Sequence, residues 1–273
     1  MTTRHDTLVQ HQFGATAQDY VSSTTHAQGA DLIHIAAMAA QVRPVHALDL
    51  GCGGGHVAYA MTPHAARITA CDLSADMLMA VEAEAARRGI AHIATARAAA
   101  EALPFADDSF DFLACRFSAH HWRDVARGLA EARRVLRPGG VAVFADVIAP
   151  PLAAADTHLQ AIEVLRDPSH GRNYSERQWA AMLAEAGFTV TNEQQGRLRM
   201  EFAAWTARMR TPAPAMEAIR LIQSRASQEV ADHFGIEEDG SYMLDTITLT
   251  AAWGRKYRQR FGENWMPCKE YNF

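Results

Sequence analysis

Short apolar runs alternate with amphipathic stretches over the first two thirds of the chain. The runs occupy residues 45–50, 66–71, 90–99, 112–116 and 141–146. Each has the length of a single strand, and helical periodicity separates most of them. In one such stretch, Val125, Leu129, Ala132 and Leu136 fall on one face of a helix. Strands that alternate with helices predict a parallel, doubly wound α/β sheet.

Capping residues delimit the helices that the pattern predicts. Ser74 and Asp124 are expected N-caps, because their side chains can accept hydrogen bonds from the free N–H groups of a first turn. Ser175 and Gln178 have the spacing of a capping box at the start of a further helix. Residues 1–44 are also expected to be mostly helical.

Beyond residue 187 the pattern predicts three further elements. A sixth strand begins at Phe188, an amphipathic helical stretch occupies residues 202–239, and a last strand occupies residues 247–251. The helical stretch has no place in a minimal doubly wound sheet, so we interpret it as an insertion that covers a substrate. The charged residues of 253–273 are interpreted as a solvated tail.

The segment that follows the first strand carries the clearest chemical signal. It reads Asp49-Leu50-Gly51-Cys52-Gly53-Gly54-Gly55-His56. Glycines adopt positive φ and leave room for a ligand, and a helix that begins at His56 would present free N–H groups to the same turn. A dinucleotide-binding G-x-G-x-x-G motif would need glycine or alanine at position 56. The second strand ends in Asp72, at the spacing of an acid that binds ribose hydroxyls.

The D-x-G-x-G-x-G pattern resembles motif I of the class I S-adenosylmethionine (SAM)-dependent methyltransferases. Two later segments strengthen the resemblance: E-A-L-P-F-A-D-D-S-F-D at 101–111 and L-R-P-G-G at 136–140. The resemblance covers about residues 40–190. It is closest to the branch that contains the ubiquinone and menaquinone biosynthesis methyltransferases.

The resemblance implies a fold, a cofactor and a domain plan. The fold is a Rossmann-like, doubly wound seven-stranded sheet with an antiparallel last strand and helical lid elements. SAM is the cofactor and S-adenosylhomocysteine the product, with the methyl group passing to an O, N or C nucleophile of a small molecule. The plan is an N-terminal helical lid at 1–44, a SAM-binding core at 45–200, a helical substrate-covering insertion at 201–246, and the last strand with the tail at 247–273.

A set of cofactor-binding residues also follows from the resemblance. It comprises Tyr20, Asp49, Gly51, Gly53, Asp72, Leu73, Met77, Ala99, Ala100, Glu101 and Arg116. Tyr20 belongs to the segment that is expected to close over the cofactor, together with residues 26–29. For Phe13, packing of a scaffold helix on the sheet is an equally open interpretation. Arg116 is placed to pair with either the SAM carboxylate or a nearby acid.

The expected adenine site departs from the family pattern. The acid that usually contacts the adenine amino group falls on Ala99 in this chain. Adenine selection would then rest on the backbone at Ala99 and Ala100, on Glu101, and on an apolar wall. Leu73 and Met77 are the candidates for that wall.

His120 and His121 follow the fourth strand, in a loop that the resemblance places between the methionine part of SAM and the substrate. Adjacent histidines in an extended loop point in different directions, so they make a poor metal pair and no metal is expected. We interpret His120 as facing the substrate and His121 as structural, with the reverse assignment open. A neutral imidazole can remove the proton of the nucleophile, and a purely positional role fits as well.

Composition limits the partners and the compartment. The net charge of −5 gives no basic field for nucleic acid or an anionic membrane. Cys52, Cys71, Cys115 and Cys268 are scattered, as is typical of reduced cytosolic thiols. The sequence predicts a cytoplasmic protein with a small-molecule substrate, and it leaves the oligomeric state unknown. A catalytically silent SAM-binding regulatory protein and a nicotinamide-dependent oxidoreductase are the alternatives that remain open.

Overall fold

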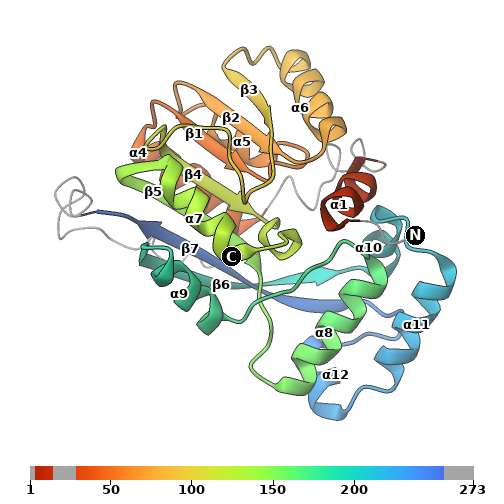
Figure 1. The fold of residues 1–273 in the computed structure, drawn as a ribbon. Helices are drawn as coiled ribbons and strands as arrows, with labels where there is room; N and C mark the ends of the chain where they lie inside the picture. Colours follow the sequence, from red (N-terminus) through yellow and green to blue (C-terminus); the bar gives the residue numbers. More distant parts are fainter. Residues whose placement is uncertain (1–3, 15–28, 255–273) are drawn as a thin grey trace.

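The computed structural model describes residues 4–14 and 29–254, which form one sheet with helices on both faces (Figure 1). The strands are β1 (Ala47–Leu50), β2 (Ile68–Asp72), β3 (Ile93–Arg97), β4 (Phe110–Arg116), β5 (Leu136–Val147), β6 (Thr189–Met200) and β7 (Tyr242–Ala252). The seven strands have the order β3-β2-β1-β4-β5-β7-β6. β7 is antiparallel to β5 and β6, and the other neighbours are parallel. The doubly wound sheet with an antiparallel last strand is therefore confirmed.

Helices cover the two faces of the sheet and bury an apolar layer on each. α4 (Ala30–Val42), α5 (His56–Met61) and α6 (Ala75–Arg87) pack on one face, where Ile35 and Val81 are fully buried. α7 (Val125–Val135) and α9 (Glu176–Glu185) pack on the other, where Leu129 and Leu183 are fully buried. α4 is thus a scaffold helix of the core, although it lies within the residues 1–44 expected to form the lid.

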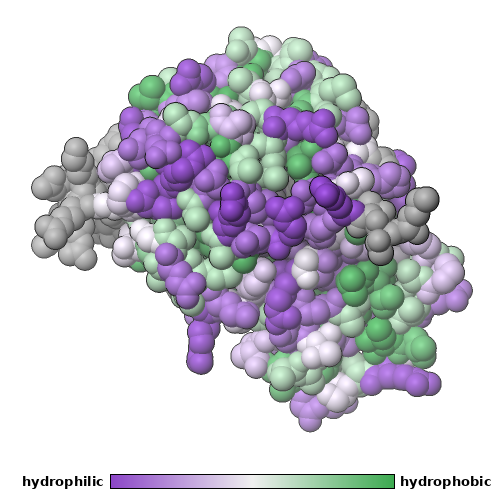
Figure 2. Space-filling view, in the orientation of Figure 1, coloured by the Kyte–Doolittle hydropathy of each residue, from purple (hydrophilic) through white to green (hydrophobic). Residues whose placement is uncertain are grey.

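A third group of helices packs around the ends of β6 and β7, to one side of the sheet (Figure 1). It consists of α8 (Ala153–Arg166), α10 (Phe202–Arg208), α11 (Ala213–Ser224) and α12 (Gln228–Phe234). Leu159, Trp205 and Tyr242 lie in its buried cluster. On the outside, apolar side chains gather over α8 and α11 (Figure 2), where Val164 and Leu221 are half exposed. None of the helices in the described parts of the chain is long and apolar enough to cross a membrane.

Local signals in the sequence give the helix starts correctly and the strand starts less well. The Ser74 and Asp124 side chains accept hydrogen bonds from Met77 N and Arg127 N, and Ser175 with Gln178 forms a complete capping box. Leu136, which we expected on the apolar face of α7, instead begins β5 and pairs with Phe110. The next pair is Phe112 with Val141, so the register shifts between Phe110 and Phe112, and periodicity cannot reveal such a pairing. β7 also begins at Tyr242 rather than at residue 247, because it pairs with the end of β6.

Gly51 and Gly53 allow a matched test of the turn after β1. Both have positive φ, at 70° and 46°, but a Cβ on Gly51 would collide with the Ser118 side chain while one on Gly53 would meet nothing within 4 Å. We expect Gly51→Ala to lower the free energy of unfolding by about 3 kcal/mol, from left-handed strain plus overpacking. Gly53→Ala should lower it by about 1 kcal/mol, from strain alone. Urea denaturation measures both, and equal losses would contradict this account of the turn.

Candidate active site

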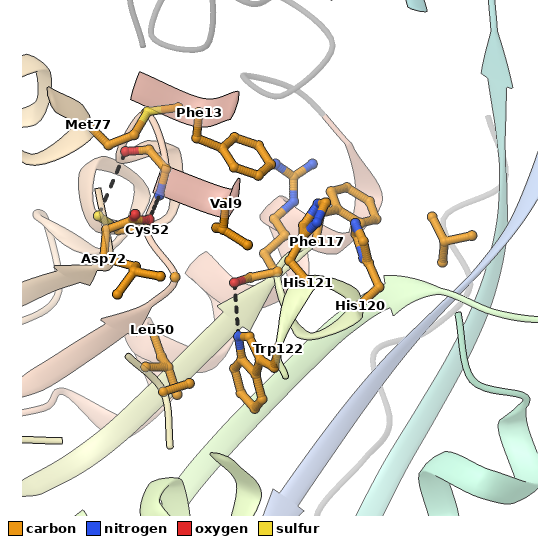
Figure 3. A pocket seen from close by; sticks show the side chains of 18 of the residues that line it. Val9, Phe13, Leu50, Cys52, Asp72, Met77, Phe117, His120, His121 and Trp122 are labelled. Carbon is orange, nitrogen blue, oxygen red and sulfur yellow. Dashed lines mark hydrogen bonds between the residues drawn. The ribbon is translucent and has the colours of Figure 1, made fainter. Parts of the chain in front are cut away.

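A pocket opens at the carboxyl ends of β1, β2 and β4, and it has two ends. The glycine end is lined by residues 49–54, Asp72, Leu73, Met77 and residues 98–101. The histidine chamber is lined by His120, His121, Glu163, Arg166, Trp205 and Arg208. Figure 3 shows side chains of both ends around the pocket, with Asp72 and Met77 on one side and Phe117, His120 and His121 on the other. Two groups of candidate residues that are far apart in the sequence therefore share one cavity.

The glycine turn is fixed by contacts with the neighbouring strand β2, and the end of β1 beneath it is held by α5. Gly51 N and Cys52 N both donate to the carbonyl of Cys71, at 2.8 and 2.9 Å. Asp49 is buried beneath the turn, and its Oδ2 accepts a hydrogen bond from Ala58 N of α5 at 2.9 Å. Burial raises the pKa of Asp49 to about 7, against the opposing effect of that hydrogen bond. Asp49 thus joins β1 to α5 and also lines the pocket.

Asp72 lies at the end of β2 with its carboxylate at the glycine end. Its Oδ2 accepts a hydrogen bond from Gly53 N, and its Oδ1 accepts one from Ser74 N, both at 2.9 Å. Burial raises the pKa of Asp72, although the backbone donors oppose the shift. Each oxygen keeps lone-pair capacity beyond one backbone contact, because a carboxylate has about four acceptor sites. The side chain is therefore oriented and still able to accept hydrogen bonds from a ligand.

The residues expected around adenine lie together at the glycine end. Leu73, Met77, Ala99, Ala100 and Glu101 all line the pocket. The carboxylate of Glu101 already has a structural partner, because its Oε1 accepts a hydrogen bond from the backbone N of Asp124 at 3.0 Å. Glu101 therefore holds the start of α7 as well as one wall of the pocket.

Helix α1 (His5–Gly14) lies across the pocket between α6 and α10 (Figure 1). The Phe13 ring packs with Met77 of α6 and stands edge-on to His121, with ring centroids 4.8 Å apart. Gln12 Nε2 donates to the carbonyl of Met209, just after α10, at 2.8 Å. His5 Nε2 lies 2.8 Å from the carbonyl oxygen of His121. α1 thus contacts both ends of the pocket, whereas Tyr20 and residues 26–28 lie outside the described residues.

Arg116 ends β4 and forms part of the pocket wall. Its guanidinium pairs with Asp31 of α4 through Nε and through Nη2, the latter at 3.2 Å from Oδ1. It also lies over the Phe117 ring, 4.7 Å from the centroid. Of the two partners considered for Arg116, the nearby acid is the one that this structure contains. Phe117 itself has φ 50°, which turns the chain sharply into the histidine loop.

His120 forms a pair with Asp146 at the end of β5. His120 Nδ1 lies 2.5 Å from Asp146 Oδ1, and the same carboxylate accepts hydrogen bonds from His120 N and Val147 N. Burial of His120 lowers its pKa, but Asp146, Glu163 and Asp167 together outweigh burial and hold the pKa above its usual value. Because Nδ1 faces Asp146, Nε2 is the ring nitrogen left for chemistry in the chamber.

His121 has a different environment although it is the next residue. Its Nδ1 lies 3.2 Å from the carbonyl oxygen of Ser169, and its ring packs against Phe13. Burial, followed by the neighbouring His120, lowers the pKa of His121 to about 4. A neutral ring with a backbone partner fits the structural role expected for His121.

Several chamber residues were missed by reasoning from the sequence. Asp146 is a strand-end acid like Asp72, and that signal alone could have identified it. Glu163 and Arg166 lie on α8, Asn173 lies in the loop that follows, and Trp205 lies within α10. These side chains meet only because the third helix group packs beside the sheet. No group of three or more metal-ligating side chains occurs in 4–14 and 29–254.

Comparison with known proteins decides the family. A family model described as a methyltransferase domain matches residues 48–144. The chain is 33% identical to the uncharacterized methyltransferase YcgJ of Bacillus subtilis, over 82% of this chain and 88% of YcgJ. The crystal structure of YcgJ matches with a TM-score of 0.79 and 30% identity, over 82% of this chain and 98% of that one. The chain belongs to the class I, SAM-dependent methyltransferases.

Two further relatives match different shares of the chain. The uncharacterized Escherichia coli protein YafE is 41% identical over 74% of this chain and 97% of its own length. The ubiquinone/menaquinone biosynthesis C-methyltransferase UbiE of Paracoccus denitrificans is 42% identical, but over only 35% of this chain and 39% of UbiE. The likeness to UbiE thus covers part of each protein, whereas the likeness to YafE and YcgJ spans most of it.

Proposed function

We propose that this methyltransferase binds SAM at the glycine end of the pocket and methylates a small molecule held in the histidine chamber. The observation that carries the proposal is the single pocket that joins Asp72 and the glycine turn to His120. A methyl donor at one end and an acceptor at the other would meet inside one cavity. The helical stretch 201–246, through Trp205 and Arg208, would then cover the acceptor.

The residues at the glycine end fit the cofactor. A Cβ on Gly53 would project into open space, so the turn leaves room for a ligand. The Asp72 carboxylate is held by Gly53 N and Ser74 N, and its remaining lone pairs would accept hydrogen bonds from the two ribose hydroxyls. Leu73 and Met77 provide an apolar surface for a base. Arg116 is paired with Asp31. Its guanidinium would lie near the amino-acid part of SAM.

The chain contributes positioning and exclusion of water to the reaction. When bound, SAM supplies an electrophilic methyl group on a positively charged sulfur. α1 covers the pocket through Phe13, Gln12 and His5, so that it shields the reacting groups from solvent. The walls of the histidine chamber would hold the acceptor in line with the methyl group. The reaction between the two bound molecules is then effectively unimolecular, which lowers its entropic barrier.

Methyl transfer is tested by incubating the protein with SAM that carries a deuterated methyl group and a panel of phenols, enols, amines and thiols. Mass spectrometry should find S-adenosylhomocysteine together with one acceptor class that gains the label. Cofactor binding without label in any acceptor would favour the silent SAM-binding protein instead.

The role of α1 leads to a separate prediction. If α1 closes over the cofactor, its amide groups should exchange more slowly when the ligand is present. We expect hydrogen exchange of residues 5–14 to slow on addition of S-adenosylhomocysteine, while α11, remote from the glycine end, remains unchanged. Mass spectrometry of peptides follows both segments. If the ligand does not change hydrogen exchange in α1, then α1 is a scaffold helix and does not close over the cofactor.

A further inference from the structure

We infer that Asn173 determines acceptor specificity: its side-chain amide donates a hydrogen bond to an uncharged carbonyl oxygen on an otherwise apolar acceptor. The inference rests on the proposed function, since it concerns the molecule held in the histidine chamber. Three features of the chain support it: a buried donor without a partner, a backbone that holds this donor in place, and the composition of the chamber wall.

The first feature is the unpartnered amide. Asn173 is 2% exposed, and it lines the pocket. Its Nδ2 is buried and has no hydrogen-bond partner within residues 4–14 and 29–254. A buried donor without a partner lowers the stability of a protein, so such groups are rare in folded chains. A ligand that places an oxygen atom beside Asn173 would supply the missing partner.

The second feature is the support of the Asn173 backbone. Asn173 N donates to Oε1 of Gln160 on α8 at 3.1 Å, and the Asn173 carbonyl accepts from Nε2 of the same side chain at 3.0 Å. Two residues earlier, Gly171 N donates to the carbonyl of His120 at 2.8 Å. These contacts use backbone atoms of the loop and join it to α8 and to the histidine loop. The amide therefore needs little reorganisation to bind a ligand.

The third feature is the composition of the chamber wall. The guanidinium of Arg166 is already engaged, because it pairs with Glu163 at 3.4 Å and donates to the Trp205 carbonyl at 3.0 Å. A carboxylate on the acceptor would lose its hydration without gaining Arg166 as a partner, whereas a carbonyl group needs only one donor. Apolar side chains from β5, β6 and β7 also line the pocket: Val147, Leu198, Met200 and Leu244.

The hydrogen-bonding capacity of the amide selects among uncharged groups as well. An ammonium group has no lone pair with which to accept a bond from Nδ2 of Asn173. A hydroxyl group can accept the bond, but it brings a proton that needs a second partner in apolar surroundings. A carbonyl oxygen only accepts. A ketone, ester or amide on an apolar body is therefore the class of acceptor that fits best.

The test uses three small probes with the full chain and saturating S-adenosylhomocysteine. Acetophenone carries the carbonyl group, ethylbenzene has a methylene group in its place, and benzoate has a charged carboxylate. Ligand-observed NMR measures the three affinities. We expect acetophenone to bind more tightly than benzoate. Acetophenone labelled with carbon-13 at the carbonyl should also show a downfield shift of that carbon when bound, because its oxygen accepts a hydrogen bond.

Substitutions at Asn173 separate binding from a structural role. Asn173→Ala should weaken acetophenone binding about tenfold and leave ethylbenzene binding unchanged. Asn173→Asp has nearly the same size but replaces the donor by an acceptor, so it should weaken acetophenone binding at least as much. In urea denaturation without ligand, Asn173→Ala should be as stable as the unmodified protein or more stable, because the backbone contacts with Gln160 remain.

Asn192 provides the matched control. It is an asparagine of β6 whose buried Oδ1 also lacks a hydrogen-bond partner in the described parts of the chain, but it does not line the pocket. Asn192→Ala should bind acetophenone and ethylbenzene as the unmodified protein does. A loss of acetophenone affinity that is specific to position 173 then reports a contact with the ligand.

The outcomes separate the inference from the function on which it rests. Absence of S-adenosylhomocysteine binding would contradict the proposed function itself. If S-adenosylhomocysteine binds but acetophenone does not, or if benzoate binds more tightly than acetophenone, the inference is overturned. It is also overturned if Asn173→Asp keeps the affinity for acetophenone, or if Asn173→Ala weakens both probes equally. Selective loss of acetophenone binding in both variants, together with loss of the carbon-13 shift, supports it.

Discussion

His120→Ala is expected to lower the turnover number by roughly 10²–10⁴-fold, the range that a positioned general base contributes. The reason is that Nε2 of His120 faces the chamber while Nδ1 is held by Asp146 at 2.5 Å. The affinity for S-adenosylhomocysteine should be unchanged, because His120 lies away from the glycine end. The rate of S-adenosylhomocysteine formation with an acceptor from the screen measures the first quantity, and calorimetry measures the second.

His121→Ala is the matched control for that prediction. His121 contacts the Ser169 carbonyl and the Phe13 ring, so its loss should lower stability and loosen α1 more than it lowers turnover. Equal kinetic losses for the two variants, or full turnover in His120→Ala, would contradict the assignment of His120 as the base.

The pH profile should carry the signature of the same pair. The base acts only when unprotonated, so turnover is lost as the pH falls through the pKa of His120. The carboxylates that face His120 hold this pKa above its usual value against burial, and they come from β5, α8 and the loop after α8: Asp146, Glu163 and Asp167. His121 and His170, whose rings lie beside it, have lowered pKa values of about 4 and about 2 and stay neutral. Asp146→Asn should therefore move the acidic limb of the profile to lower pH.

Asp72→Ala is expected to weaken binding of S-adenosylhomocysteine by about 2–4 kcal/mol, or roughly 30- to 1000-fold. Two ribose hydroxyls would lose a charged acceptor. Gly53 N and Ser74 N would also lose the carboxylate that holds the turn. Calorimetric titration measures the loss.

Two further variants separate these contributions. Asp72→Asn keeps an oxygen for the backbone donors but removes the charge, and it should lie between the wild type and the alanine variant. Asp76→Ala removes an exposed acid in the first turn of α6 and should leave the affinity unchanged. Unchanged affinity in Asp72→Ala would place the ribose elsewhere.

Features encoded by neighbouring residues were predictable from the sequence. The apolar runs gave the parallel strands, and the caps at Ser74, Asp124 and Ser175 gave three helix starts. Asp72 could be singled out because an acid at a strand end, one βαβ step after a glycine turn, lies at a fixed edge of the sheet. The family expectation followed from the same ordered motifs.

Features that depend on tertiary packing were not predictable. The partner of His120 is Asp146, 26 residues away, and only the adjacency of β4 and β5 brings the two side chains together. The start of β5 at Leu136 is seen only in its pairing with Phe110 of β4, which periodicity does not record. Likewise, α8 contributes Glu163 and Arg166 to the chamber only because the third helix group packs beside β6 and β7.

The central claim is that the glycine end holds SAM rather than a nicotinamide dinucleotide. Calorimetric titration of the full chain with S-adenosylhomocysteine, and in parallel with NAD, tests it most directly. The account predicts one-to-one binding of S-adenosylhomocysteine that Asp72→Ala weakens, and no heat of binding for NAD. Tight binding of NAD without any binding of S-adenosylhomocysteine would contradict it.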